Sequence, residues 1–185
     1  MLTVTSTAIE AVKIITPTSF VDSRGELCET YNRPRFLEHG IAMEFVQDTQ
    51  SLSVRAGTIR GLHFQSGPAA QGKLARVLRG SIFAVAVDLR RSSPTYGKWT
   101  AERLSAADGK QMLVPVGFAH GFCTLEPDTC VFYKVTACYS KANDLGIAWD
   151  DPDLAIDWPV LSGKAILSER DTQLPAFNSL AAYFE

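Results

Sequence analysis

The sequence predicts a mainly β fold, a sandwich or barrel of short strands with a few short helices. Two observations support this prediction. Short runs rich in β-branched and aromatic residues recur along the chain, with glycine or proline between them, and only one stretch carries the start and stop signals of a helix. Short strands at this spacing are typical of all-β sandwiches and barrels.

The expected strands follow one another with turn residues between them. Gly25, Gly57 and the Gly67-Pro68 pair punctuate the first runs, and Gly80 divides the longest one. The region 150–159 is rich in Asp and Pro and is expected to be a loop, whereas 161–185 has room for a turn of helix. The runs expected to form strands are 11–16, 26–31, 45–54, 58–65, 73–89 (with Gly80 in its middle), 99–104, 111–114, 121–125, 130–139 and 146–149.

The expected helix covers residues 32–40. Asn32 is suited to the N-cap, and Pro34 then falls in the first turn, where its missing N–H costs nothing. Gly40 is suited to end the helix. His39 then lies in the last turn, where a partly cationic side chain interacts favourably with the helix dipole. We therefore interpret it as a helix-end residue and not as a ligand.

Alternation along the run 132–139 would place Tyr133 and Tyr139 on one face of a strand. Two tyrosines on one face can line a single cavity, or they can be ordinary sheet aromatics. The strand pattern alone leaves both interpretations open.

Composition limits the classes of function. The net charge of -2 argues against a general nucleic-acid-binding protein, although it permits a basic pocket for one diphosphate. No apolar run approaches the roughly 20 residues that cross a bilayer, and the first residues have no signal-peptide core, so we expect no membrane partner and a cytoplasmic location. The four cysteines form no Cys-x-x-Cys pair, and we expect buried free thiols rather than disulfides.

Two histidines are candidate catalytic groups, namely His63 and His120. An imidazole is a common base for a proton on the carbon beside a carbonyl group, but each histidine alone is as well explained as a structural residue. Arg60 and His63 would point to opposite faces of a regular strand. Both reach one site only if Gly61 permits a bulge or the strand ends there.

The segment 115–120 has the Pro-x-Gly-x-x-His pattern of cupin barrels, many of which bind a metal. The first cupin element normally supplies His-x-His, whereas this chain has His63-Phe64-Gln65. Two histidines without a nearby Glu make a poor transition-metal site. We therefore expect a cupin-like jelly-roll barrel without a metal, and the chain has no Gly-x-Gly-x-x-Gly fingerprint of a dinucleotide cofactor.

Cationic side chains near expected turns and strand ends could hold a phosphate, or could be ordinary solvated surface. They are Arg24, Arg60, Lys73 and Arg170.

Segments through nearly the whole chain, in one order, resemble the dTDP-4-dehydrorhamnose 3,5-epimerase family. The order and spacing of the segments carry the resemblance, more than any one of them. They are 20–25, 45–48, 59–65, 71–74, 87–90, 92–97, 117–122, 133–134 with Tyr139, 149–152, 158–159 and 167–171.

The resemblance implies a homodimer of single-domain chains, each a domain over residues 1–185. Its jelly-roll core would span about 20–160, with an N-terminal strand and a C-terminal extension packed on it. The implied reaction is epimerisation at C3 and C5 of dTDP-4-dehydro-6-deoxy-D-glucose to dTDP-4-dehydro-L-rhamnose. It proceeds by proton abstraction and reprotonation through an enolate, without a cofactor or metal.

The resemblance also assigns roles. His63 corresponds to the general base, Asp171 to its orienting carboxylate, Tyr133 to the acid on the opposite ring face and Lys73 to a partner of the enolate oxygen. A tyrosine suits the acid role if nearby cations draw its pKa down. The positions that correspond to substrate-binding residues are Arg24, Glu29, Gln47, Asp48, Thr49, Arg60, His120, Tyr139, Asp144 and Arg170.

Four positions depart from the family pattern. The family commonly has Asn at Thr49, Asp at Ala84, Glu at Val116 and Lys at Arg170. A missing carboxylate at position 84 can change the pKa of a pocket histidine such as His120. The alternative is therefore an epimerase that acts at C3 or C5 alone, on a related nucleotide-linked 4-keto sugar. A metal-dependent cupin oxygenase is disfavoured by the absent His-x-His, and a non-catalytic sugar-binding cupin by the presence of His63, Tyr133 and Asp171.

Overall fold

The computed structural model describes residues 2–185 and consists of two antiparallel sheets with a separate hairpin. The six-stranded sheet has the order β1 (Leu2–Ser6), β2 (Lys13–Pro17), β10 (Gln111–Val114), β7 (Lys73–Arg79), β12 (Thr129–Val135) and β5 (Gln47–Ser53). The five-stranded sheet has the order β13 (Asp144–Gly146), β6 (Ile59–Gln65), β11 (Phe118–Thr124), β8 (Ser81–Asp88) and β9 (Trp99–Ser105). The mainly β class is confirmed.

The two sheets face each other across an apolar layer, and strand β8 shows how the sequence builds it. Ile82 and Ala84 point into the cluster between the sheets, together with residues such as Met112 and Val131. Val85 and Val87, at alternate positions, belong to a second cluster on the other face. Strand β8 is therefore buried on both faces, as its continuous apolar run requires.

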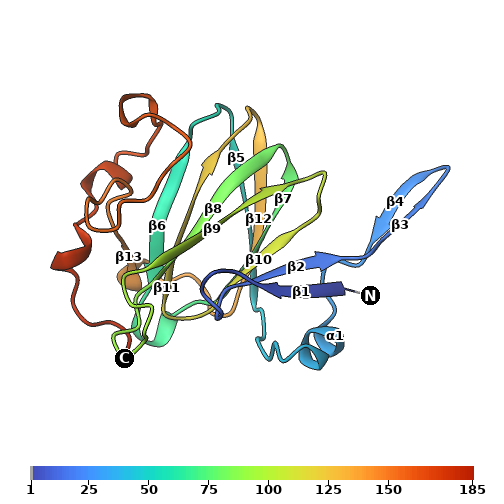
Figure 1. Cartoon of the computed structure of the whole chain (residues 1–185), viewed down its shortest axis with the longest axis horizontal. Coiled ribbons are helices and arrows are strands. Elements are labelled where there is room, and N and C mark those ends of the chain that lie inside the picture. The colour runs from blue at the N-terminus through green and yellow to red at the C-terminus, as the bar shows by residue number, and fades with distance from the viewer. Residues whose placement is uncertain (1) are drawn as a thin grey trace.

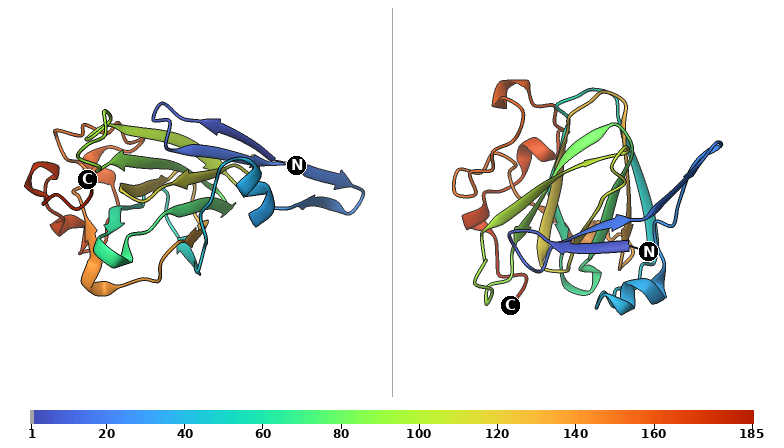
Figure 2. Two further views of the ribbon diagram at one scale, coloured as in Figure 1. Left: turned by 90° about the horizontal axis from the view of Figure 1, so that it is seen from below. Right: turned by 45° about the vertical axis from the view of Figure 1, so that its right-hand side comes forward.

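The C-terminal segment covers the outer face of the five-stranded sheet. Where the sequence has room for a turn of helix, it contains short 3-10 turns at Ser162–Lys164, Asp171–Gln173 and Phe177–Ser179. Trp158 and Phe177 pack there against Val87 and Trp149. Figure 2 shows this segment, in orange and red, at the end of the molecule opposite the hairpin. The 3-10 turn Asp171–Gln173 contacts β6 and so brings Asp171 to this strand.

The expected helix is confirmed as α1 (Arg33–Glu38). The Asn32 side chain accepts a hydrogen bond from the Arg35 backbone N–H at 3.2 Å, Pro34 lies in the first turn, and Gly40 has φ of +74°. The helix places Phe36 in a third cluster on the outer face of the six-stranded sheet, with Ile15 and Leu74.

Strands β3 (Ser19–Asp22) and β4 (Gly25–Cys28) form a hairpin that projects away from both sheets (Figure 1). All four residues of β3 are exposed, including Phe20 and Val21. Strands β1 and β3 are not among the strands expected from the sequence. β1 is an edge strand and the hairpin packs on no core, so neither needs many apolar residues. For that reason neither run carries a clear strand signal in the sequence.

Several strand limits and the expected burial of the cysteines are wrong; the strand expected over 146–149 is found at Asp144–Gly146, and that over 26–31 ends at Cys28. The strand expected over 130–139 ends at Val135, which is paired with Gln47 of β5 and Lys73 of β7, the first residues of both neighbours. Pairing continues only through the Thr136 N–H, which donates to the Gly72 carbonyl at 3.1 Å, and the chain then leaves the sheet. The cysteines are free thiols, but only Cys123 is buried; Cys28 and Cys130 are half-buried and Cys138 is exposed.

Candidate active site

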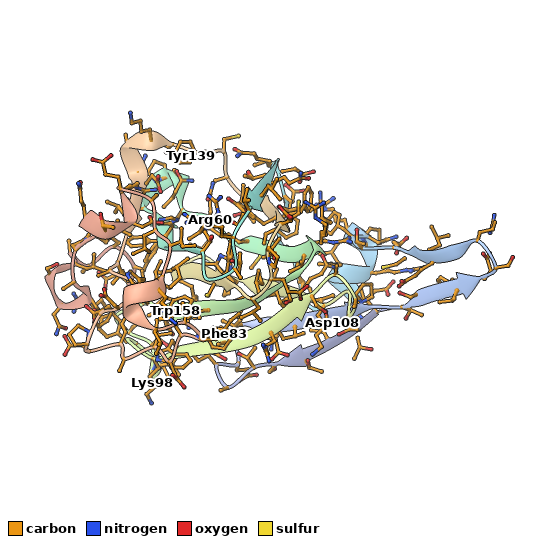
Figure 3. The ribbon with its side chains drawn as sticks, turned by 90° about the horizontal axis from the view of Figure 1, so that it is seen from above. Arg60, Phe83, Lys98, Asp108, Tyr139 and Trp158 are labelled. Carbon is orange, nitrogen blue, oxygen red and sulfur yellow. The ribbon has the colours of Figure 1, made fainter. Side chains whose placement is uncertain are left out.

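Two adjoining cavities of about 500 and 340 Å³ lie at one end of the space between the sheets. Strands β6 and β11 form one wall of the larger cavity, and β5 and β12 form the other. Arg60 belongs to the larger cavity and Tyr139 to the smaller one, and Figure 3 labels both. Four residues line both cavities, which makes them one cleft: His63, Lys73, Tyr133 and Arg170.

His63 and Asp171, 108 residues apart in the chain, form a close pair in this cleft. His63 Nε2 lies 2.6 Å from Asp171 Oδ1, and Asp171 is only 4% exposed. Burial alone would raise the pKa of Asp171, but hydrogen bonds from His63, the Gly61 N–H and Ser168 more than offset burial and hold that pKa below its usual value. An ionised carboxylate accepts the Nε2 proton and leaves Nδ1 of a neutral His63 free to take another.

Arg60 and His63 reach the same cavity because β6 carries a bulge. His63 lies opposite His120 and Arg60 opposite Phe122, so β6 uses three steps where β11 uses two. Gly61, with φ of +122°, lies within this irregular stretch. A Cβ at Gly61 would approach the Cα of Gly121 to 2.6 Å. The bulge expected as the condition for a shared site is therefore present.

Lys73 and His120 bring two further nitrogens to the His63 side of the cleft. Desolvation is the main cause that lowers the pKa of Lys73 to about 8; Asp144 opposes this shift and Arg170 adds to it. Burial lowers the pKa of His120 to about 3, with contributions from Lys73 and His63. At neutral pH this part of the cleft therefore holds an ammonium group next to an uncharged imidazole. The buried Nε2 of His120 has no hydrogen-bond partner among the described residues.

Tyr133 faces the cleft from β12, in the sheet opposite His63. Burial raises the pKa of Tyr133; Arg60 opposes the shift and Asp144 adds to it. The condition stated for the acid role, a pKa drawn down by nearby cations, is not met, because desolvation outweighs the effect of Arg60. Tyr133 is protonated at neutral pH and so holds a proton that it can donate.

Three charged or polar side chains meet at the outer end of the smaller cavity. Arg170 Nη1 lies 2.9 Å from Asp144 Oδ2, and the Tyr139 hydroxyl donates to the same oxygen at 3.0 Å. Tyr139 lies past the end of β12, so it reaches the cavity from a loop and not by the strand alternation expected from the sequence. It nevertheless lines the smaller cavity together with Tyr133.

Alternation along β5 decides which of its residues face the cleft. Gln47 and Thr49 line the smaller cavity and Ser51 the larger one. Asp48 points to the opposite face of the sheet, where Lys134 Nζ binds it at 2.9 Å. The structure therefore does not bring the Asp48 side chain into the cleft of its own chain.

Arg24 and Glu29 also lie outside the cleft. Arg24 sits at the turn of the projecting hairpin and pairs with Asp22, and its side chain is 87% exposed. Glu29 pairs with Arg35 at 2.8 Å. Neither residue lines the cleft formed by its own chain.

Several polar residues of the cleft are missing from the site expected from the sequence. Ser168 accepts a hydrogen bond from the Asp171 N–H at 3.1 Å and Ser51 lines the larger cavity, while Gln65 and Gln71 line the smaller one. The signal for Ser51 was present, because it lies two and four residues after Thr49 and Gln47 on one strand. Nothing local marks the glutamines, whose partners lie more than 60 residues away.

The positions that depart from the family pattern differ in their distance from the cleft. Thr49 and Arg170 line it. Ala84 is buried in the cluster between the sheets, and Val116 is 42% exposed; neither lines either cavity. Over residues 2–185, no group of three or more His, Cys, Asp or Glu side chains is placed to hold a metal ion, and no helix is long and apolar enough to cross a membrane.

Comparison with known proteins gives one consistent family. A family model described as dTDP-4-dehydrorhamnose 3,5-epimerase matches residues 6–179. A curated relative from Sinorhizobium fredii, named dTDP-4-dehydrorhamnose 3,5-epimerase, is 48% identical over 180 residues, which cover 97% of this chain and 92% of the relative.

Solved structures of similar proteins indicate the same family. A Bacillus anthracis dTDP-4-dehydrorhamnose 3,5-epimerase with TDP and PPi bound is 49% identical and superposes with a TM-score of 0.92 over 95% of this chain and 99% of that one. A Legionella pneumophila 3,5-epimerase in complex with dTDP-4-keto-L-rhamnose is 40% identical, with a TM-score of 0.93 over 98% and 96% of the two chains. These matches confirm the expected cupin-like fold.

Proposed function

This chain belongs to the dTDP-4-dehydrorhamnose 3,5-epimerase family, and from that membership we propose that it epimerises C3 and C5 of dTDP-4-dehydro-6-deoxy-D-glucose to form dTDP-4-dehydro-L-rhamnose. It is an isomerase. The observation that carries the proposal is the His63–Asp171 pair, which faces Tyr133 across a cleft that also contains Lys73.

The chemistry requires a base, an acid and a partner for an oxyanion. C3 and C5 both flank the C4 ketone, so loss of a proton from either carbon gives an enolate whose charge rests on the C4 oxygen. Inversion follows when a proton returns to the carbon from the opposite face of the sugar ring. The proposed chemistry uses side chains of the protein and proton exchange with solvent.

His63 is the proposed base. The C–H bond breaks, its electron pair moves into the enolate, and the proton passes to His63 Nδ1. Asp171 holds the Nε2 proton in place and stabilises the imidazolium that forms, as the aspartate does in hydrolase triads. The buried carboxylate is well suited to this role because its hydrogen bonds keep it ionised.

Tyr133 is the proposed acid. It comes from the sheet opposite His63, so a sugar ring held between the sheets presents one face to each residue. Its phenolic proton passes to the carbon as the enolate collapses to the ketone. Solvent then returns a proton to Tyr133 and accepts one from His63, which resets the site for the second carbon.

Lys73 and His120 are the proposed partners of the enolate oxygen. A desolvated ammonium group stabilises a developing negative charge more strongly than one in water. The unpaired Nε2 of His120 can donate a second hydrogen bond if its ring carries the proton there. Lys73 Nζ donates to the His63 carbonyl at 3.3 Å, which leaves its other two protons for the oxyanion.

Arg60 and Arg170 are the proposed diphosphate contacts, because guanidinium groups bind phosphate oxygens in a fork. Arg60 Nε donates to Ser53 Oγ and Nη2 donates to the Leu52 carbonyl, both at 3.1 Å. These bonds fix the guanidinium group in the larger cavity and leave Nη1 for a ligand. Gln47, Thr49, Tyr139 and Asp144 are proposed to contact the substrate from the smaller cavity.

We propose a homodimer in which the projecting hairpin reaches a second copy. Phe20, Val21 and Leu27 on this hairpin are 61–77% exposed, which is costly for a hairpin surrounded by water. If Arg24 and Glu29 bind substrate, they must do so at the cleft of the partner copy. The same holds for Asp48, whose side chain faces away from the cleft of its own chain: if it binds substrate, it must do so at the cleft of the partner copy. The single domain over 1–185 and the cytoplasmic location stay predictions.

Proton NMR of dTDP-4-keto-6-deoxyglucose, incubated with the protein in D₂O, tests the proposal. Deuterium should enter at both C3 and C5, with formation of the L-sugar. His63→Ala should abolish both exchanges while the thermal transition remains cooperative. Absence of exchange at both carbons with the unmodified protein would contradict the proposed function.

A single-position epimerase is the second candidate. The observation in its favour is His120, whose Nε2 has no partner among residues 2–185. Ala84, where the family commonly has a carboxylate, is paired with Phe122, two residues after His120 on β11. Exchange at one carbon only would select this function. In that case Ala84→Asp is the variant to examine for recovered exchange at the second carbon.

A further inference from the structure

The segment 136–140 carries Tyr139 to the cleft and leaves the six-stranded sheet after Thr136, whose N–H donates to the Gly72 carbonyl at 3.1 Å. It begins where β12 ends and runs to the 3-10 turn Lys141–Asn143. Beyond Thr136 the backbone polar groups therefore need partners other than a neighbouring strand. Figure 3 shows Tyr139 at the surface of the molecule, and the residue is 56% exposed.

Three glutamine side chains supply these partners. Gln47 Oε1 accepts from the Tyr139 N–H at 2.8 Å, and Gln65 Oε1 accepts from the Ser140 N–H at 2.6 Å. Gln71 Nε2 donates to the Ala137 carbonyl at 2.7 Å. All three line the smaller cavity, and they come from the start of β5, the end of β6 and the loop before β7.

The bonds converge from elements that are far apart in the chain but fixed by the sheets. Gln65 is only 3% exposed, so its bond to Ser140 is shielded from water. The phenol of Tyr139 is held separately, by Asp144, which Arg170 also pairs. Both the backbone and the ring tip of Tyr139 are thus tied to groups that line the cleft.

We propose that Gln47, Gln65 and Gln71 form a clamp on segment 136–140 that positions Tyr139 at the entrance of the cleft. Gln65 and Gln71 are positioning residues, because they act on the substrate through Tyr139. Gln47 has both amide atoms engaged within the protein, since its Nε2 also donates to Thr49 Oγ1 at 3.2 Å. The kinetic part of the test below rests on the proposed epimerase function, whereas the amide-exchange part does not.

Amide hydrogen exchange of Tyr139 and Ser140 measures the clamp directly. Gln65→Met keeps the length and volume of the side chain but removes the acceptor, and Gln71→Met removes the donor to Ala137. Loss of one hydrogen bond should speed exchange of these amides roughly three- to tenfold. Gln65→Glu keeps an acceptor for Ser140 and should stay within about twofold of the unmodified protein.

Gln50→Met is the matched control, because Gln50 is exposed on the other face of β5 and lines neither cavity. It should leave the exchange of both amides unchanged. Unchanged exchange in both Gln65→Met and Gln71→Met would overturn the clamp. Equal acceleration by Gln65→Glu and Gln65→Met would also overturn it, since the acceptor would then not be what holds the segment.

A double-mutant cycle tests whether the clamp acts through Tyr139. In the unmodified background, Gln65→Met and Gln71→Met should each raise KM roughly three- to tenfold with a smaller change in kcat. In a Tyr139→Ala background the same changes should alter KM less than about twofold. An undiminished effect in that background would refute positioning through Tyr139. If the unmodified protein exchanges neither C3 nor C5 protons, the epimerase proposal fails, while the amide exchange still decides the clamp.

Discussion

Replacement of Asp171 by Asn tests the tautomer of His63. The Asp171 carboxylate accepts hydrogen bonds from His63 Nε2, from the Gly61 N–H and from Ser168. An asparagine has only one oxygen, and two donors of the surrounding structure, Gly61 and Ser168, compete for it. The amide NH₂ would then face His63 Nε2, which must lose its proton to accept.

The proton of a neutral His63 would move to Nδ1, the atom proposed to abstract the substrate proton. Catalysis would then require the minor tautomer, and the imidazolium would lose its negative partner. The corresponding change in a hydrolase triad costs about 10⁴-fold in rate. We expect Asp171→Asn to lower the rate of C3 and C5 exchange by about 10³-fold or more, equivalent to about 4 kcal/mol of transition-state free energy.

The assay is the initial rate of deuterium uptake at each carbon, measured by proton NMR at saturating substrate. Asp157→Asn removes the same charge and lines neither cavity, so it is the matched control. Binding of dTDP should change little in Asp171→Asn, since the proposed diphosphate contacts are intact. Exchange within threefold of the unmodified protein would refute the role assigned to the His63–Asp171 pair.

Three further predictions follow from the site and the hairpin. Tyr133→Phe removes the proposed acid and should slow inversion by about 10²–10⁴-fold while isotope exchange falls less; equal losses of inversion and exchange would argue against an acid role. The pKa of Lys73 is lowered to about 8. Above that pH its ammonium group loses its charge, so kcat/KM should fall as pH rises from 8 to 10, and a flat profile would contradict its role at the enolate oxygen. The double variant Phe20→Ser/Leu27→Ser should weaken a homodimer by about 100-fold or more, because each apolar side chain loses roughly 1.5–3 kcal/mol of burial. Sedimentation equilibrium measures this, with Val116→Ser, an exposed residue of another loop, as the control.

Local patterns predicted most of the strands and the single helix. Alternation and turn residues define β8, β9 and β10 to within a residue or two, since these strands are paired along their length. The caps of α1 are also local, because Asn32 bonds within one turn. Where a boundary depended on neighbours, as for β12 at Val135, the local pattern continued past the true end.

The candidate site was predictable only in part. The sequence singled out His63, His120, Tyr133 and Lys73 by residue type and context, and the resemblance added Asp171 and the catalytic roles. The resemblance placed Arg24, Glu29 and Asp48 at the substrate, although the structure puts none of them in the cleft of their own chain. Their position is set by a projecting hairpin and by strand alternation, which motif order does not encode.

The sequence by itself determined the β class, the helix, the family resemblance and the identity of the groups able to move protons, because these depend on residue type and short-range spacing. Only the tertiary structure decided that Asp171 lies 2.6 Å from His63 across 108 residues, that a bulge turns Arg60 and His63 to one cavity, and that burial raises the pKa of Tyr133. Those properties depend on distance and desolvation, and both arise only when the two sheets and the C-terminal segment have packed together.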